Sequence, residues 1–313
     1  MERVSEASVQ KIDWLTPAER MPWTVSTPFR MRPNLEKLDP ESPALLLHDD
    51  LAPAYARERE RVLREARERA LVGEANEDVI RAICDLVPSL PRGGNTTPSP
   101  SRGGVGWGWG SSDVQPNPIP ASPLKGEEPL LLSLQEDFVI LKHDADTLRT
   151  EYLSVCFPSR WDPREKLGLN FSQIHAPVAD NQMLIAAGPS IMTMAFMKQP
   201  MLRHVWLIVP SASLPQHPDQ NDYSWAKTLA DSAPLLPRLF FRVERQTTWP
   251  LPQFNRAVFF IRVMMSPLCD VLRIAPRRAP ELADALRSMT PAVVAYRGMT
   301  DAMPRLLAEL DAM

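Results

Sequence analysis

The chain has 313 residues, of which 44% are hydrophobic and 23% charged, so a sizeable folded core is expected. Its formal net charge of -3 argues against nucleic acid or an anionic membrane as the main partner, because both select basic surfaces. Three widely separated cysteines, Cys84, Cys156 and Cys269, form no CxxC pair and indicate a reducing compartment without a disulfide framework.

The N-terminal part predicts extended chain followed by two helices. Its opening, MERVSEASVQKIDWL, lacks the apolar segment of a signal peptide. No run in the chain approaches the roughly 18 apolar residues of a membrane span, so we expect a cytoplasmic protein with no membrane partner. Prolines favour an extended or looped 28–39, whereas apolar spacing predicts helices over 54–73 and about 76–87, the second stopped by Pro88. We expect residues 1–91 to pack on the core that follows.

Residues 92–127 read as an insertion. All of the 12 glycines except Gly73, Gly168, Gly188 and Gly298 lie there, together with many Pro and Ser residues and few aliphatic side chains. Such a segment buries too little apolar surface to offset its ordering entropy, and we predict that it is disordered. Its GVGWGWG run matches neither dinucleotide-binding nor phosphate-loop spacing.

Short apolar runs after the insertion predict a sheet. Candidate strands cover 129–142, 151–157, 204–209, 238–247 and 257–265, and candidate helices cover about 180–198, 277–289 and the last dozen residues. Strands with flanking helices indicate an α+β fold with a mostly antiparallel sheet, and residues 128–313 form the predicted core with C-terminal helices.

The five histidines do not have the spacing of a multi-ligand metal site. A haem needs only one axial imidazole with an apolar wall and cations for its propionates. His175 is the best candidate, because Pro177 restrains the backbone near it; His143, His204 and a Cys156 thiolate are the competing ligands. The structural alternative is a core histidine bonded to a backbone carbonyl.

The stretch FFRVERQTTWPLPQFNRAVFFIRV (240–263) places charges inside an apolar strand pair. Strand alternation puts Glu244 and Gln246 on one face and Arg245 and Thr247 on the other, with a hairpin bend at 249–255. One interpretation is an internal Glu–Arg bridge. The other is a pocket in which Glu244 holds a cationic substrate or Arg245 an anionic group.

Several of these stretches together resemble a known family. They are CFPSRWDPREKLG and IHAPV within 156–178, VERQT and LP within 243–252, PFRMR at 28–32 and QEDF at 135–138. In this order, over most of 20–300, they resemble the haem-dependent oxidative N-demethylases. The resemblance implies a PAS-like fold, in which an antiparallel sheet and its helices surround a ligand.

The resemblance also implies an activity and a set of site residues. The activity is oxidative removal of a methyl group from a small secondary amine at haem b, using O2 and electrons from NADH through a separate reductase with FMN and an iron–sulfur cluster. His175 then matches the axial iron ligand, Arg164 and Lys166 could face the propionates, and Glu244 and Arg245 match the strand motif. A PAS-like haem or small-molecule sensor and a family member without cofactor remain alternatives, and homo-oligomerisation is left open.

Overall fold

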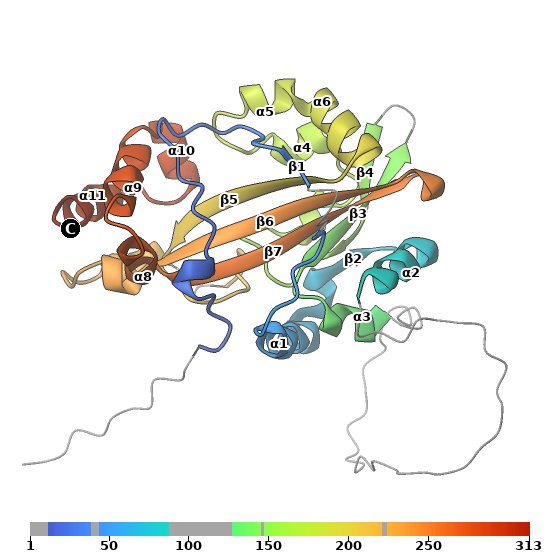
Figure 1. Cartoon of the computed structure of the whole chain (residues 1–313), viewed down its shortest axis with the longest axis horizontal. Coiled ribbons are helices and arrows are strands. Elements are labelled where there is room, and N and C mark those ends of the chain that lie inside the picture. The colour runs from blue at the N-terminus through green and yellow to red at the C-terminus, as the bar shows by residue number, and fades with distance from the viewer. Residues whose placement is uncertain (1–11, 39–43, 88–126, 145–146, 221–223) are drawn as a thin grey trace, which may run out of the picture.

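The computed structural model describes residues 12–38, 44–87, 127–144, 147–220 and 224–313. Seven strands form one antiparallel sheet in the order β1-β5-β6-β7-β3-β4-β2 (Figure 1). The strands are β1 Glu36–Lys37, β2 Leu71–Gly73, β3 Asp137–Asp144, β4 Thr147–Ser154, β5 Met201–Val209, β6 Phe240–Leu251 and β7 Arg256–Pro267. This arrangement confirms the α+β class and the antiparallel sheet.

The helices gather in three groups around the sheet (Figure 1). Those beside the end of β3 and β4 are α1 Ala52–Ala70, α2 Glu77–Leu86 and α3 Glu127–Ser133. Those between β4 and β5 are η2 Pro163–Lys166, α4 Phe171–His175, α5 Gln182–Ala186, α6 Gly188–Thr193 and the π-helical turn η3 Met194–Lys198. The third group contains η1 Ala18–Arg20, α7 Trp225–Leu229, η4 Leu236–Arg238, α8 Leu268–Arg273, α9 Arg278–Arg287, α10 Pro291–Tyr296 and α11 Met303–Asp311, whereas η5 Pro252–Phe254 lies apart in the turn between β6 and β7.

The two faces of β6 are covered by different groups. Phe241 and Val243 point to one face, where they join the core made by the C-terminal helices. On the other face, Leu184, Ile191 and Phe196 of the α5–η3 segment pack on Val139, Leu141 and Phe259 of the sheet. Because alternate residues of a strand face opposite ways, Glu244 points to this second face. We call it the Glu244 face.

The β6–β7 hairpin confirms the predicted bend, which occupies residues 252–255. Glu244 lies opposite Val263, and Thr248 lies opposite Phe259. Asn255 closes the turn in the left-handed region at φ 55°, a conformation that asparagine tolerates better than most residues. The alternation predicted for Glu244 and Arg245 therefore holds along the strand.

A buried carboxylate fixes the chain where β4 ends. Asp137 accepts hydrogen bonds from the backbone N–H groups of Cys156 (2.9 Å) and Phe157 (2.8 Å) and from Arg59 Nη1 (2.8 Å). Both members of the Asp137–Arg59 ion pair are 1% exposed. Removing one partner of such a pair typically costs about 3–5 kcal/mol, so this contact holds the following segment, 157–161, firmly in place.

Most predicted elements are confirmed, and two were partly wrong. The predicted helices over 54–73 and 76–87 correspond to α1 and α2, except that residues 71–73 form strand β2, which pairs with β4; the candidate strands correspond to β3–β7. Residues 129–133, however, belong to helix α3, where Leu130 and Leu131 are buried. A short apolar run suits either a buried strand or a buried helix, and a proline in the first helical turn is tolerated.

The predicted insertion 92–127 lies outside the described residues, except for Glu127, which begins α3. The helices on either side of it share one core: Val79, Ile80 and Ile83 of α2 cluster with Leu130 and Leu131 of α3.

We expect residues 92–125 to be dispensable for folding when a Gly-Ser linker of about ten residues replaces them. Shortening a long loop changes its closure entropy by only about 1 kcal/mol, so the melting temperature should move by a few degrees at most. Thermal melting of the deletion protein measures this. Insoluble or unfolded protein would instead show that Trp107 or Trp109 contributes to packing.

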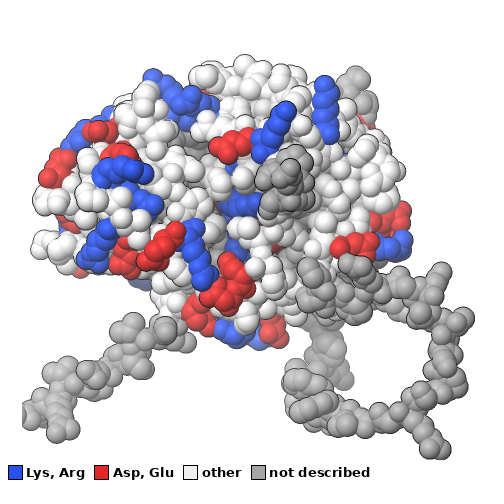
Figure 2. Space-filling view, viewed as in Figure 1, with Lys and Arg blue, Asp and Glu red and all other residues white. Residues whose placement is uncertain are grey.

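The surface agrees with the mixed charge of the chain. Acidic and basic side chains are interspersed over the face seen in Figure 2. Within the described ranges, no helix combines the length and the hydropathy that a membrane span requires.

Candidate functional site

The backbone around His175 is held on both sides. Asn170 caps helix α4: its side chain accepts from Gln173 N (3.0 Å), and the Gln173 side chain accepts from Asn170 N (3.0 Å). After the helix, Asn181 Nδ2 donates to the carbonyl oxygens of His175 and Ala176, both at 3.0 Å. A five-residue helix is marginal alone, so these side-chain bonds fix where its last residue lies.

The imidazole of His175 has a defined tautomer. Its Nδ1 lies 2.8 Å from the carbonyl oxygen of Phe171, which is the backbone contact that the structural alternative predicted. Because a carbonyl only accepts, Nδ1 carries the hydrogen and Nε2 carries the lone pair. Burial lowers the pKa of His175, the hydrogen bond to the Phe171 carbonyl raises it, and the positive charges of Arg203 and Lys166 lower it, so that the net shift is downward. The side chain is therefore a neutral imidazole, and no hydrogen bond among the described residues occupies Nε2.

Glu244 is buried, at 8% exposure, and accepts two hydrogen bonds. Ser159 Oγ donates to Oε1, and Gln246 Nε2 donates to Oε2 at 2.7 Å. These partners are a serine and a glutamine, so the carboxylate is not held by the internal Glu–Arg bridge that sequence reasoning allowed. A carboxylate offers about four lone-pair sites, which leaves capacity for another donor.

Arg242 forms a hydrogen bond with Ser159. Arg242 Nε donates to Ser159 Oγ (2.8 Å), and its Nη groups donate to the carbonyl oxygens of Phe157 (2.8 Å) and Leu214 (2.9 Å). Burial lowers the pKa of Arg242 to about 10, so it remains protonated at neutral pH. Arg242, Ser159 and Glu244 thus form a chain of hydrogen bonds whose serine is fixed by the anchored 157–161 segment.

Arg203 of strand β5 lies on the same face. It pairs with Gln246 across the sheet, and its neighbour Val205 pairs with Glu244. Directly opposite residues share a face, so Arg203 and Glu244 are diagonal neighbours. The Nε atom of Arg203 is buried and has no hydrogen-bond partner among the described residues. Its charge also reaches His175, whose pKa it lowers, so Arg203 links the helical and strand parts of the site.

The structure brings some of the predicted site residues together and separates others. Lys166 ends η2 and is near enough to His175 for its charge to act on that pKa. Arg164 is exposed and donates to Asp162, with Nη2 to Oδ2 at 2.6 Å. Arg245 points to the opposite face of the sheet, where it donates to the carbonyl oxygens of Ala44 and Leu45. Arg245 therefore anchors the N-terminal segment.

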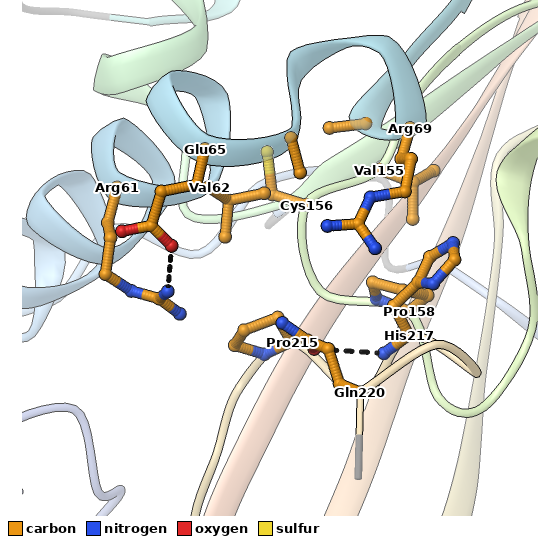
Figure 3. A pocket seen from close by; sticks show the side chains of 12 residues that line it. Arg61, Val62, Glu65, Arg69, Val155, Cys156, Pro158, Pro215, His217 and Gln220 are labelled. Atoms are coloured by element: carbon orange, nitrogen blue, oxygen red, sulfur yellow. Dashed lines mark hydrogen bonds and ion pairs between the residues drawn. The ribbon is translucent and has the colours of Figure 1, made fainter. Parts of the chain in front are cut away.

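The competing iron ligands lie elsewhere. His204 pairs with Arg245 and shares its face, and His143 lies near the end of β3. Burial raises the pKa of the Cys156 thiol to about 12, which disfavours a thiolate. Cys156 lines a cavity of about 40 Å³ between α1 and segment 155–158, together with His217 (Figure 3).

A second cavity, of about 290 Å³, is lined by Arg160, Trp225 and Gly298 among others. Neither cavity is lined by His175 or Glu244. The described residues also contain no cluster of three His, Cys, Asp or Glu side chains that could hold a metal ion. The chemistry available at His175 is therefore that of one neutral imidazole on which the charges of Arg203 and Lys166 act.

The fold and the site together define an α+β protein whose donor set suits a prosthetic group with a single imidazole ligand. Residues 111–307, more than half of the chain, match the family model described as haem-dependent oxidative N-demethylase, alpha subunit-like. The chain belongs to this family, which confirms the resemblance found in the sequence. No curated protein matches the chain.

The residues present fit the haem that the family description names. The unprotonated Nε2 of His175 offers a lone pair to a metal. The hydrogen bond to the Phe171 carbonyl holds its Nδ1, as is usual for metal-binding histidines. Arg203, whose buried Nε has no partner among the residues described, and Lys166 supply positive charges that act on this imidazole. The sequence analysis did not predict Arg203, Arg242 or Ser159 as site residues. Arg203 could have been found by the signal that indicated Glu244, because both are charged residues within apolar strands.

Proposed function

We propose that this chain binds haem b through His175 and, with the haem bound, removes a methyl group oxidatively from a small secondary amine. The observation that carries the proposal is the hydrogen bond from His175 Nδ1 to the Phe171 carbonyl, which leaves a neutral Nε2 free to bind iron. The family match supports the cofactor and the reaction type.

The proposed fold is PAS-like, with residues 128–313 as the ligand-binding core and residues 1–91 packed on it. The central strands lie in the order β5-β6-β7-β3-β4. Of these, β3 comes first in the amino-acid sequence and β7 comes last, and the two lie side by side. The helical connection from β4 to β5 packs on the Glu244 face. This arrangement supports a ligand held between the sheet and that connection.

The bound haem supplies the oxidation chemistry, using O2 and external electrons. In the proposed reaction a methyl group becomes formaldehyde and its C–N bond breaks. One O2, two electrons and two protons are consumed, and water and a primary amine are released. Glu244 accepts a hydrogen bond from the alkylammonium group and orients it. Ser159 and Gln246 hold the carboxylate in place while it does so.

The electrons come, in this proposal, from NADH through a separate reductase that carries FMN and an iron–sulfur cluster. The description of the family as an alpha subunit supports the idea of a second subunit. We place the reaction in the cytoplasm, in keeping with the sparse, unpaired cysteines.

Two spectroscopic measurements test the proposed function. Protein purified from cells fed a haem precursor should show a Soret band, which a family member without cofactor would lack. With dimethylamine, NADH and a flavin/iron–sulfur reductase added, NADH oxidation should accompany formaldehyde release. A Soret band with no amine-dependent turnover would instead identify a sensor.

A further inference from the structure

Arg203 is a charged residue whose hydrogen bonds the protein does not complete. It occupies the third position of strand β5, between Leu202 and His204, and its Nε is buried without a partner in the described part of the chain. Burial lowers its pKa, and only the negative charge of Glu244 acts in the opposite direction. Keeping an arginine in such a position costs stability unless a further acceptor joins it.

Glu244, the diagonal neighbour of Arg203, does not bond to it. Glu244 receives hydrogen bonds from Ser159 and Gln246, and none of the hydrogen bonds or ion pairs formed by the described residues joins it to Arg203. The planar guanidinium donates through two parallel N–H groups, which match the two oxygens of a carboxylate. No described residue supplies this acceptor, and an anionic group from outside the chain would complete it.

We propose that Arg203 is a carboxylate-binding residue of the site beside His175. The inference rests on the proposed function for the identity of the ligand, because two carboxylates could reach this position. One is a propionate of the haem. The other is the carboxylate of an N-methyl amino acid, whose ammonium group would lie at Glu244, the diagonal neighbour of Arg203.

The two sources make different predictions for an Arg203→Gln variant. Loss of a charge-assisted hydrogen bond should weaken the affected ligand by about 10- to 100-fold. If Arg203 binds a haem propionate, the variant binds haem more weakly than the wild type. The two proteins should then bind haem dimethyl ester equally well, because the ester has no free propionate. If the substrate carboxylate binds, haem affinity is unchanged, and the variant loses affinity for N-methylglycine but not for dimethylamine.

The titrations use the full chain, with haem followed at the Soret band and amines followed by calorimetry on the haem-loaded protein. Arg273→Gln, which removes an exposed arginine from α8, is the control for the loss of one positive charge. Arg203→Lys keeps the charge but not the planar fork, so it should lose part of the affinity, and it replaces Arg203→Gln if that variant does not fold.

One result overturns the proposal: a folded Arg203→Gln protein that binds haem, its dimethyl ester, N-methylglycine and dimethylamine as the wild type does. A wild-type protein that binds no haem would refute the proposed function alone. In that case acetate is titrated into the apoprotein. Acetate binding that the variant loses supports the carboxylate site, and absence of binding to the wild type contradicts it.

Discussion

Replacing His175 with alanine is expected to abolish stable haem binding. The neutral Nε2 is the iron ligand in our proposal, and no other described histidine shares the Glu244 face with an imidazole tautomer set in this way. Loss of a partner that only supports a metal ligand costs about 10- to 100-fold in affinity, and loss of the ligand itself should cost more. Titration of the apoprotein with haem, followed at the Soret band, measures the change.

The matched control is His204→Ala, which removes an imidazole from the opposite face of the same sheet. It should bind haem as the wild type does, and both variants should melt near the wild-type temperature because both imidazoles are only half-buried. An unchanged Soret band in the His175 variant, with loss in a His143, His204 or Cys156 variant, would transfer the ligand role to that residue.

Replacing Glu244 with glutamine is expected to weaken amine binding while leaving the fold nearly intact. Its present partners, Ser159 and Gln246, can also bond a neutral amide, so only a small change in stability should follow. The alkylammonium loses a charge-assisted hydrogen bond, which contributes about 1.5–3 kcal/mol, or roughly 10- to 100-fold in Kd. Amine titration of the haem-loaded protein and thermal melting measure the two effects separately.

Ser159→Ala provides the control for Glu244, because it removes one hydrogen bond from the carboxylate but keeps its charge. We expect this variant to bind amine more weakly than the wild type and more tightly than Glu244→Gln. A purely structural Glu244 would behave differently. If it only compensates a buried cation, the glutamine variant loses about 3–5 kcal/mol of stability and still binds amine normally.

The sheet and the orientation of its charged residues could be predicted because strand alternation is local. The two-residue period of 240–263 placed Glu244 and Arg245 on opposite faces without knowledge of the tertiary structure. The same is true of the β6–β7 bend, which Pro252 and Asn255 form. Helix and strand could not be separated in 129–133, since packing of Leu130 and Leu131 against α2 decides between them.

The candidate site was predictable only in part. His175 was found through Pro177, yet the bonds that hold it come from Asn170, Gln173 and Asn181. The NFSQ stretch carries a capping pattern that could have located the start of α4.

The hydrogen bonds that hold Glu244 could not be predicted from such a local pattern. Ser159 and Arg242 are separated by 83 positions in the chain and meet only in the folded protein. Local patterns contain no information about such a contact. The apolar strand around Arg203 did offer a signal, because a charged residue inside it needs a partner.

The central claim is that the imidazole of His175 holds the haem iron. Resonance Raman spectroscopy of the ferrous, haem-loaded protein measures the iron–imidazole stretch directly. We predict that this band is present in the wild type, absent from His175→Gly and restored when free imidazole is added to that variant. A band that persists unchanged in His175→Gly without added imidazole would contradict the claim.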